Sequence, residues 1–314
     1  MDDTSGFENF YAEKIEPSLP QLRKECRQMD SWHLVAVLAG ILGFLCFIGY
    51  HAEVLTGAQA SWLFVLFAAL LVFSVYKFAQ RTDRFTAAFK KAVIKTIIDD
   101  VCPGLVYKPD ECITTREYKT SSLYRYRYDY FDGDDYIEGT IGNVSFHCSE
   151  LNVKSDYAGN KQVFVFKGLF FVAGINERFS GGTYVWPRNS AQLATSIMDQ
   201  RYRLLPMPEV ADVHFDDEEF TAQFRVCSTW PEQAKEILTT EIRANLVSMS
   251  RLMNIALSVS FVAGHCFIGV PVRNDLLEPT DYDPGDTIEI KKYFLTIQAI
   301  KNIISKSGLS ELQY

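Results

Sequence analysis

The sequence predicts an α+β protein. An N-terminal two-helix transmembrane hairpin with a helical stalk precedes a mixed, largely antiparallel β-sheet domain with packed helices. Two long uncharged apolar runs near the N-terminus predict the hairpin, and short runs of period 2 mixed with longer helical patterns predict the domain. The expected boundaries are 1–31 for an amphipathic N-terminal segment, 32–80 for the hairpin, 81–101 for a juxtamembrane helix and 102–314 for the α+β domain.

The composition suits a folded protein with a sizeable core, because 48% of the 314 residues are apolar and 14% are aromatic. The net charge of −8 is unevenly distributed. Residues 1–95 carry ten Lys/Arg against nine Asp/Glu, or +1, and residues 96–314 carry 21 against 30, or −9. An acidic C-terminal part argues against non-specific nucleic-acid binding, which needs a basic face.

The two apolar runs, 32–50 and 62–79, are each long enough to cross about 30 Å of hydrocarbon at 1.5 Å per residue. The first contains no Lys, Arg, Asp or Glu, and the second is uncharged until Lys77. Neither has a polar face, so we favour transmembrane helices over buried core helices. Aromatic residues that favour the membrane interface stand at their ends: Trp32, Tyr50, Trp62 and Tyr76.

The charges that flank these runs predict the orientation. Lys and Arg residues precede the first run and follow the second, whereas the connecting segment 51–61 has none. The positive-inside rule therefore predicts a multi-pass protein with both termini in the cytoplasm. The seven cysteines are odd in number and lack a framework spacing, which fits a reducing compartment.

The juxtamembrane helix carries one apolar stripe, formed by Phe85, Phe89, Val93 and Ile97. A basic helix beside a membrane can hold anionic headgroups. The alternative, which we favour, is a stalk whose stripe packs on a short N-terminal helix, and the two roles can coexist. The candidate headgroup contacts are Arg81, Arg84, Lys90, Lys91 and Lys95.

Small residues in the first apolar run recur at a spacing that lets helices approach closely. The pairs are Ala36 with Gly40 and Ala39 with Gly43. We favour packing within the hairpin over dimerisation, so a homo-oligomer stays open as an alternative.

The C-terminal domain alternates predicted strands and helices. We expect "YRYRYDYF" to form a half-exposed strand with its tyrosines inward, and "QVFVFKGLFFVAGIN" to form a core strand with a bulge at Lys167–Gly168. Lys167 is also a candidate anion contact. The other predicted elements are strands at 139–151 and 181–187, a segment 220–228 after them, a helix at 230–252, a hairpin at 256–272 and a helix at 288–309 with Gly308 at its C-terminal cap.

The order of these segments resembles a bacterial membrane-anchored family, the domain of unknown function 3137. The likeness is strongest over 136–270 and rests on "DYIEGTIGNVSF", "VFKGLFFVAGIN", "FTAQFRVCST", "EILTTEIRANLV" and "ALSVSFVAGHCFIGV". Gly174 and Ile175 stand where the family often has an aspartate and an aromatic residue. The resemblance implies an inner-membrane protein with a cytoplasmic domain and no assigned activity. It also implies a LemA-type membrane protein as a partner, because genes of the two kinds occur close together.

No motif of a known enzyme class occurs in the sequence: H-E-x-x-H, C-x-x-C, G-x-S-x-G and the Walker A loop are all missing. Two pairs, His147–Cys148 and His265–Cys266, are the candidate metal ligands. Adjacent strand residues point to opposite faces, so one pair cannot chelate one metal. A site would need the two strands to pair, and we favour ordinary strand residues over a metal site and expect no cofactor.

Acidic residues cluster at 131–136, 215–220 and 281–286. We interpret all three clusters as solvated loops or helix caps. The last cluster does not fit a calcium loop, because Gly285 and Lys292 occupy positions where that loop needs ligands.

These observations favour a membrane-anchored cytoplasmic binding or scaffold module over an enzyme. One alternative is an enzyme at the inner leaflet that uses His147 or His265 with a loop acid. The other is an oligomeric component of membrane remodelling or transport. The predicted partners are the lipid bilayer and a LemA-type protein, without nucleic acid.

Overall fold

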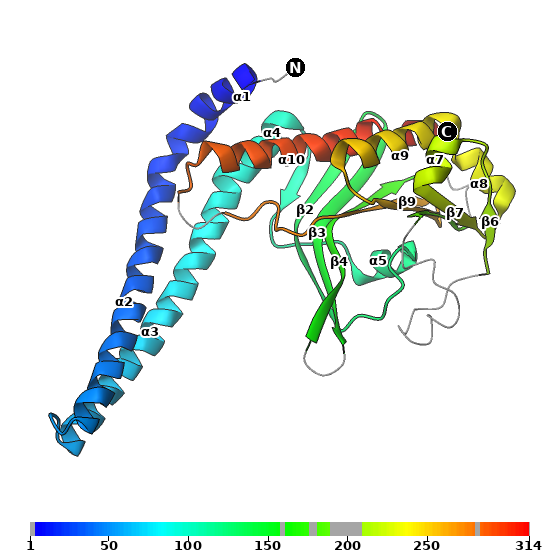
Figure 1. Cartoon of the computed structure of the whole chain (residues 1–314). Helices are drawn as coiled ribbons and strands as arrows, with labels where there is room; N and C mark the ends of the chain where they lie inside the picture. The colour runs from blue at the N-terminus through cyan, green and yellow to red at the C-terminus, as the bar shows by residue number, and fades with distance from the viewer. Residues whose placement is uncertain (1–3, 158–160, 176–180, 189–208, 280–282, 314) are drawn as a thin grey trace. The chain divides into compact units, whose positions relative to one another are not determined.

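The computed structural model describes residues 4–157, 161–175, 181–188, 209–279 and 283–313 (Figure 1). The chain folds into two units. The first consists of residues 1–97 and 277–293, and the second consists of residues 98–276 and 294–314. The α+β class predicted from the sequence is confirmed: long apolar N-terminal helices precede an antiparallel sheet with helices.

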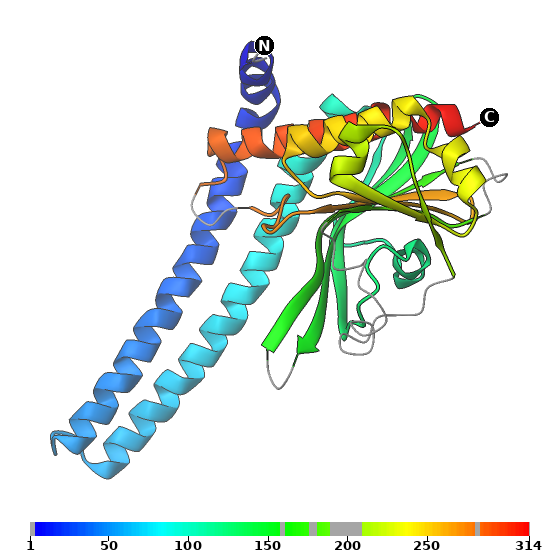
Figure 2. The same cartoon turned by 45° about the vertical axis from the view of Figure 1, so that its right-hand side comes forward.

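The first unit is dominated by two antiparallel helices that lie side by side in Figures 1 and 2. Thr56 and Gln59 form a reciprocal capping box that starts the second of them. Pro17 and Pro20 occupy first-turn positions, where a missing N–H costs nothing. The elements in order are α1 (Thr4–Phe10), the π-helix η1 (Tyr11–Ile15), the 3-10 helix η2 (Glu16–Ser18), α2 (Leu19–His51), α3 (Gly57–Phe89), the π-helix η3 (Lys90–Ile94) and α4 (Lys95–Val101), whose last residues belong to the second unit.

The predicted apolar stripe is buried. Phe85, Phe89, Val93 and Ile97 are at most 3% exposed. Residues of the N-terminal helices are buried in the same unit, and the Phe89 ring meets Tyr293 edge-on at a centroid distance of 5.8 Å. The helical segment that contains the second apolar run continues to Val101. Its part from Phe85 to Ile97 packs into the core of the first unit through this stripe.

The second unit is built on one sheet of nine described strands in the order β1-β2-β3-β4-β9-β8-β5-β7-β6, in which each pair is antiparallel. The strands are β1 (Val106–Lys108), β2 (Tyr130–Ile141), β3 (Val144–Tyr157), β4 (Lys161–Gly174), β5 (Thr183–Pro187), β6 (Ala211–Val213), β7 (Phe224–Ser228), β8 (Ser258–Val262) and β9 (His265–Pro271).

Helices cover both faces of this sheet. Helix α5 lies on one face, and α9 with the part of α10 from residue 294 lies on the other (Figures 1 and 2). Trp186 Nε1 donates to the Leu123 carbonyl at 3.0 Å and joins the sheet to the segment after α5. The helices are α5 (Thr115–Ser121), α7 (Glu218–Gln223), α8 (Pro231–Ile237), α9 (Thr240–Met253) and α10 (Thr287–Ser305), with the 3-10 helix η5 (Leu309–Gln313) at the end.

Two predicted strands are wrong. In "YRYRYDYF" only Tyr130 and Phe131 lie in a strand, although Tyr124 and Tyr128 do pack inward against Tyr118 at ring distances of 6.1 and 5.7 Å. The stretch 139–151 is a hairpin rather than one strand, because β2 ends and β3 begins around a turn. Gly142 has a φ of 64° in that turn, which glycine adopts without strain.

The predicted helix at 230–252 is two helices. Thr239 lies between α8 and α9, and its Oγ1 accepts a hydrogen bond from the Ile242 N–H at 3.2 Å, so it caps α9. The last long helix ends at Ser305, three residues before Gly308, so the predicted glycine cap is also wrong. The hairpin at 256–272 is confirmed as β8 and β9.

The segment "QVFVFKGLFFVAGIN" forms the core strand that was predicted, but its bulge is displaced. The register with β3 shifts between the pairs Val153–Phe166 and Lys154–Phe164, before Lys167–Gly168. Gly168 has a different role: its φ is 141°, and a Cβ there would lie 2.2 Å from the Val270 carbonyl oxygen. Only glycine allows β9 to approach β4 this closely.

Candidate functional site

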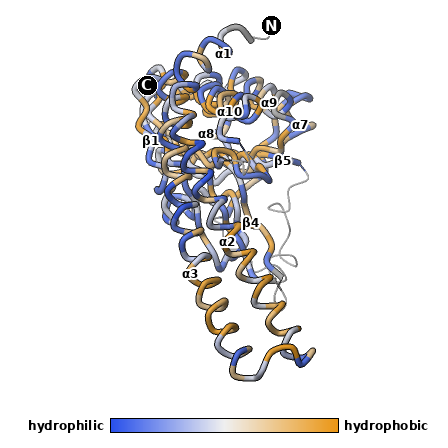
Figure 3. Tube along the Cα trace, turned by 90° about the vertical axis from the view of Figure 1, so that its left-hand side faces the viewer, coloured by the Kyte–Doolittle hydropathy of each residue, from blue (hydrophilic) through white to orange (hydrophobic). Residues whose placement is uncertain are grey.

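The apolar surface of α2 and α3 faces outward. In the most apolar window of each helical segment, only 11% and 6% of residues are buried. Phe44, Trp62 and Val72 are 63%, 77% and 70% exposed. Figure 3 shows that hydrophobic residues predominate in the parts of both helices nearest their connection. A core helix of a soluble domain would bury such side chains, and these two helices are long and apolar enough to cross a membrane.

The small residues of α2 divide between two surroundings. Ala39 is 1% exposed, and a Cβ on Gly43 would lie 3.7 Å from Phe67 Cβ on α3, so this pair packs within the hairpin. A Cβ on Gly40 would meet nothing within 4 Å. Ala39 and Gly43 therefore pack within the hairpin, as their spacing predicted.

The predicted headgroup contacts have different surroundings. Arg84, Lys91 and Lys95 are exposed, and Arg81 is half-buried, with Nη1 3.7 Å from Glu25 Oε2. Lys90 differs from the others. It is 4% exposed, and its ammonium lies 2.5 Å from Glu278 Oε1. Lys90 therefore forms an ion pair within the first unit.

A basic groove on α2 was not singled out from the sequence. It has a volume of about 440 Å³ and is lined by Arg23, Lys24, Arg27 and Ser31, among others. Arg23 Nε lies 3.3 Å from Asp283 Oδ1, and Ser31 Oγ donates to the Arg27 carbonyl at 2.7 Å. The helical spacing of these residues is the signal that could have revealed it.

The two His–Cys pairs do not meet, so the metal site that would join them is ruled out. Strand β4 lies between β3 and β9: Cys148 is opposite Phe171, whereas Cys266 is opposite Ala173. The central sheet order could not be deduced from the two dipeptides alone.

Each histidine has a local partner instead. His147 Nε2 lies 2.8 Å from Glu117 Oε1, and His265 Nδ1 lies 2.9 Å from the Ala263 carbonyl oxygen. Although burial raises the pKa of Glu117, hydrogen bonds from Thr114 and His147 bring it below its usual value. Burial raises the pKa of both neighbouring thiols, Cys148 and Cys266, which keeps them protonated and unreactive.

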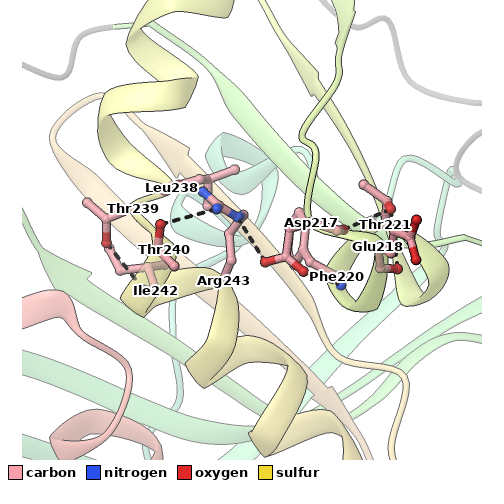
Figure 4. Close-up of polar contacts among 9 residues, drawn as sticks. All are labelled: Asp217, Glu218, Phe220, Thr221, Leu238, Thr239, Thr240, Ile242 and Arg243. Carbon is pink, nitrogen blue, oxygen red and sulfur yellow. Dashed lines mark hydrogen bonds and ion pairs between the residues drawn. The ribbon is translucent and has the colours of Figure 1, made fainter.

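The acidic cluster 215–220 caps a helix, as predicted. Asp217 Oδ1 accepts from the Phe220 N–H at 3.1 Å, and its Oδ2 lies 3.3 Å from Arg243 Nε. Arg243 also donates to the Leu238 carbonyl at 2.6 Å and lies over the Phe215 ring. Figure 4 shows the contact between Asp217, at the start of α7, and Arg243 on α9, so the cluster stabilises the fold.

The cluster 281–286 also makes turn and cap contacts where it is described. Asp283 Oδ1 accepts from the Gly285 N–H at 2.9 Å, and Asp286 Oδ1 accepts from the Ile288 N–H at 2.8 Å. Asp281 lies outside the described residues. The cluster 131–136 corrects the prediction, because it lies in strand β2 and buries Asp135, which is 2% exposed.

A polar cleft of about 760 Å³ adjoins β6 and β7, and Arg188 and His214 contribute to its lining. Asp212 binds Arg225 through two hydrogen bonds of 2.9 and 2.7 Å, and accepts from Cys227 Sγ at 3.2 Å. Burial and the Asp212 carboxylate raise the pKa of Cys227 to about 12. A thiol this weakly acidic is a poor nucleophile, and Cys227 is not among the residues that line the cleft.

A family model described as a protein of unknown function (DUF3137) matches residues 164–309. Over this region the chain is similar to that family. The resemblance noted from the sequence is thereby confirmed for this region, which begins within β4 and ends at the start of η5.

Two further comparisons add little. No protein of curated function matches the sequence. Among solved structures, the crystal structure of the mycobacterial trehalose monomycolate transport factor A, TtfA, matches with 7% identity and a TM-score of 0.35, over 68% of this chain and 92% of that one. A likeness this weak carries no argument about function.

Proposed function

We propose that this chain is a binding or scaffold module anchored in the bacterial inner membrane by α2 and α3, with both termini in the cytoplasm. The observation that carries the proposal is the outward apolar surface of these two helices, where Phe44 and Val72 are 63% and 70% exposed. In water such a surface would be unfavourable at about 25 cal/mol per Å². Hydrocarbon is the solvent that suits it.

The charges that flank the helices support the proposed orientation. Arg23, Lys24 and Arg27 precede the first apolar run on α2, and Arg84 and Lys91 follow the second on α3. We propose that the exposed members contact anionic headgroups, together with Arg81 and Lys95.

A binding role is favoured over catalysis by the chemistry of the described residues. The described cysteines Cys148, Cys227 and Cys266 have raised pKa values, and His147 is engaged by Glu117. None of these groups combines an activated nucleophile with a base. We propose a LemA-type membrane protein as the partner, on the strength of the gene neighbourhood that the family resemblance implies.

Reporter fusions test the orientation. A reporter that is active only in the cytoplasm, fused after Tyr314, is expected to be active, and alkaline phosphatase at the same position is expected to be inactive. The matched control carries the same reporters in the segment 52–56 between α2 and α3, where the activities should be reversed. Cytoplasmic-type activity at both positions would contradict the two-span topology.

A further inference from the structure

The ends of β3 and β4 that lie nearest their connection extend beyond the neighbouring strands (Figures 1 and 2). Strand β9 pairs with β4 only over Gly168–Gly174, and beyond that pairing the Val272 N–H donates to the Lys167 carbonyl at 2.9 Å. The segment Gln162–Phe166 therefore has β3 on one side and, among the described residues, no partner strand on the other. This part of β4 is an open sheet edge.

Two main-chain contacts of β3 show which groups of β4 face the open edge. The Lys154 carbonyl accepts from the Asp129 N–H at 2.9 Å, and the Asp156 N–H donates to Asp129 Oδ2 at 2.8 Å. Lys154 and Asp156 thus direct their main-chain groups away from β4. Opposite residues of an antiparallel pair point either both toward each other or both away. The residues opposite them, Phe164 and Gln162, therefore direct their N–H and C=O groups to the open edge.

The open edge is apolar on both faces. Phe164 is 59% exposed and Val163 is 37% exposed, and no charge or proline interrupts residues 162–166. The register shift of β4 lies between Phe164 and Phe166, so residues 161–164 keep a regular register with β3. An exposed apolar edge is a template for pairing with another strand, and native proteins usually protect it with charges, proline or a covering segment. This edge is therefore a surface for the addition of a β-strand.

The directions of the main-chain groups favour one self-complementary register. When Val163 lies opposite Val163 of a second copy in an antiparallel arrangement, Gln162 of each copy lies opposite Phe164 of the other. Both of these residues direct their N–H and C=O groups outward, so each such pair exchanges two hydrogen bonds. A register centred on Phe164 would place two Lys154 side chains in one row, and one centred on Gln162 would do the same with Asp156. Like charges across strands are unfavourable, so the register centred on Val163 is preferred.

The charges beside the edge also suit this register. Lys154 lies on the same face as Phe164, and its ammonium is 5.3 Å from the centre of that ring, so it reaches over β4 toward the edge. Asp156 is exposed, and neither it nor Lys154 has an ion-pair partner among the described residues, whereas Lys167 is already paired. In the self-paired sheet each row on this face contains Asp156 and Gln162 of one copy, then Phe164 and Lys154 of the other. Opposite charges thus flank each row.

We propose that a second copy of this chain adds to the sheet at this edge and forms a two-fold symmetric dimer through antiparallel pairing of Gln162–Phe164. The interface is isologous, because the same segment pairs with itself. The dimer closes the open edge of β4 and covers Val163. The pairing concerns the second unit alone, so it does not depend on the membrane anchor or on the partner proposed above.

Disulfide cross-linking of the full chain in non-ionic detergent tests the register. In Val163→Cys the two thiols belong to a non-hydrogen-bonded pair whose Cα atoms are about 4.5 Å apart, which suits a disulfide. We expect mild oxidation to link most of this variant into a dimer that a reductant separates. The matched control is Gln162→Cys, whose two thiols are not opposite each other in this register. It should stay largely monomeric under the same oxidation, as should the native chain with its own cysteines.

Sedimentation in the same detergent tests the pairing without cross-links. Gln162→Pro removes an outward N–H, which an edge strand tolerates, and should raise the dissociation constant of the dimer about tenfold or more. Its matched control, Gln162→Thr, keeps that N–H and should dimerise as the native chain does. Lys154→Glu places like charges in each row and should weaken the dimer roughly fivefold, and the further change Asp156→Lys should restore it.

Three results would overturn the proposal. The first is a native chain that stays monomeric at every concentration. The second is equal cross-linking of Val163→Cys and Gln162→Cys. The third is a dimer that Gln162→Pro leaves unchanged, as expected of a dimer held by α2 and α3. If Gln162→Pro does not fold, the loss in Lys154→Glu and its recovery with Asp156→Lys decide the matter.

Discussion

The α2–α3 hairpin and the β-sheet unit use the same kinds of side chain in opposite ways. Phe44 on α2 is 63% exposed, whereas Phe170 on β4 is fully buried. In the sheet unit, aromatic and branched residues fill a core between strands and helices, and their burial stabilises the fold. In the hairpin, most of them cover the outside, so their favourable environment must come from outside the chain. The length of an apolar run and the charges around it therefore distinguish an outward-facing apolar helix from a buried core segment better than amino-acid composition does.

Truncating one phenylalanine in each region should give the largest contrast. Phe170→Ala is expected to lower the free energy of unfolding by about 3–5 kcal/mol, because it leaves a cavity in the core. Phe44→Ala should change it by less than about 0.5 kcal/mol, because an exposed side chain leaves no cavity. Denaturant unfolding of the full chain in detergent, followed by the near-ultraviolet signal of the sheet unit, measures both. Equal losses of unfolding free energy in the two variants would contradict the different roles assigned to Phe170 and Phe44.

The sheet unit also contains a buried charge whose cost depends on pH. The pKa of Glu150 is about 7 in the folded state against an ordinary value of 4.5, so between these values the folded state holds a proton that the unfolded state has lost. Stability should therefore fall as pH rises from about 4.5 to 7, and level off above it. Each pKa unit corresponds to 1.36 kcal/mol, so the total is roughly 3 kcal/mol.

Glu150→Gln isolates this effect, because glutamine does not titrate. The variant should be more stable than the native chain at pH 8 and close to it at pH 4, as measured by denaturant unfolding. A difference in stability between the variant and the native chain that does not vary with pH would contradict the claim that ionised Glu150 destabilises the folded state.

A charge placed on each exposed surface compares the two surfaces directly. Val72→Arg, at a position 70% exposed on α3, should disfavour membrane insertion by about 2.5–3.5 kcal/mol. Val106→Arg, at a position 50% exposed on β1, should have no such effect. The fraction of each variant in the membrane pellet is the measurement. Equal recovery of both variants would count against lipid contact at Val72.

Two ion pairs within the sheet unit should give the smallest contrast. Arg243→Met removes a pair whose side chains are 14% and 25% exposed, and it also breaks the bond to the Leu238 carbonyl, so a loss of about 2 kcal/mol is expected. Arg225→Met removes a pair whose side chains are 43% and 41% exposed and should cost about 1 kcal/mol or less. Thermal unfolding ranks the two variants, and the reverse order would contradict this assignment.

The sequence was a good guide where the signal is local and strong. The two apolar runs, the α+β class and the β8–β9 hairpin could all be predicted, because each depends on a period or run contained in one segment. The stretch "YRYRYDYF" misled because its alternation imitates a strand, while Tyr124 and Tyr128 pack against Tyr118 from a loop. The break at Thr239 depends on one capping hydrogen bond within an otherwise helical pattern.

The position of Glu150 in the sheet could not be predicted, because its neighbours come together only through the register of the strands. Asp134 and Glu150 are opposite each other because β2 and β3 form a hairpin, which the sequence suggested was a single strand. The burial of Asp135 depends on the irregularity of β2, and the contact with Leu276 crosses from a segment far away in sequence. Long-range pairing of this kind leaves no periodic signal in one chain.

The central claim is that α2 and α3 are embedded in a lipid bilayer. Carbonate extraction of membranes from bacteria that express the full chain tests it most directly, because high pH releases peripheral proteins and leaves bilayer-spanning helices in the pellet. The account predicts that the chain stays in the pellet and is released only by detergent. Release of most of the chain into the carbonate supernatant would contradict it.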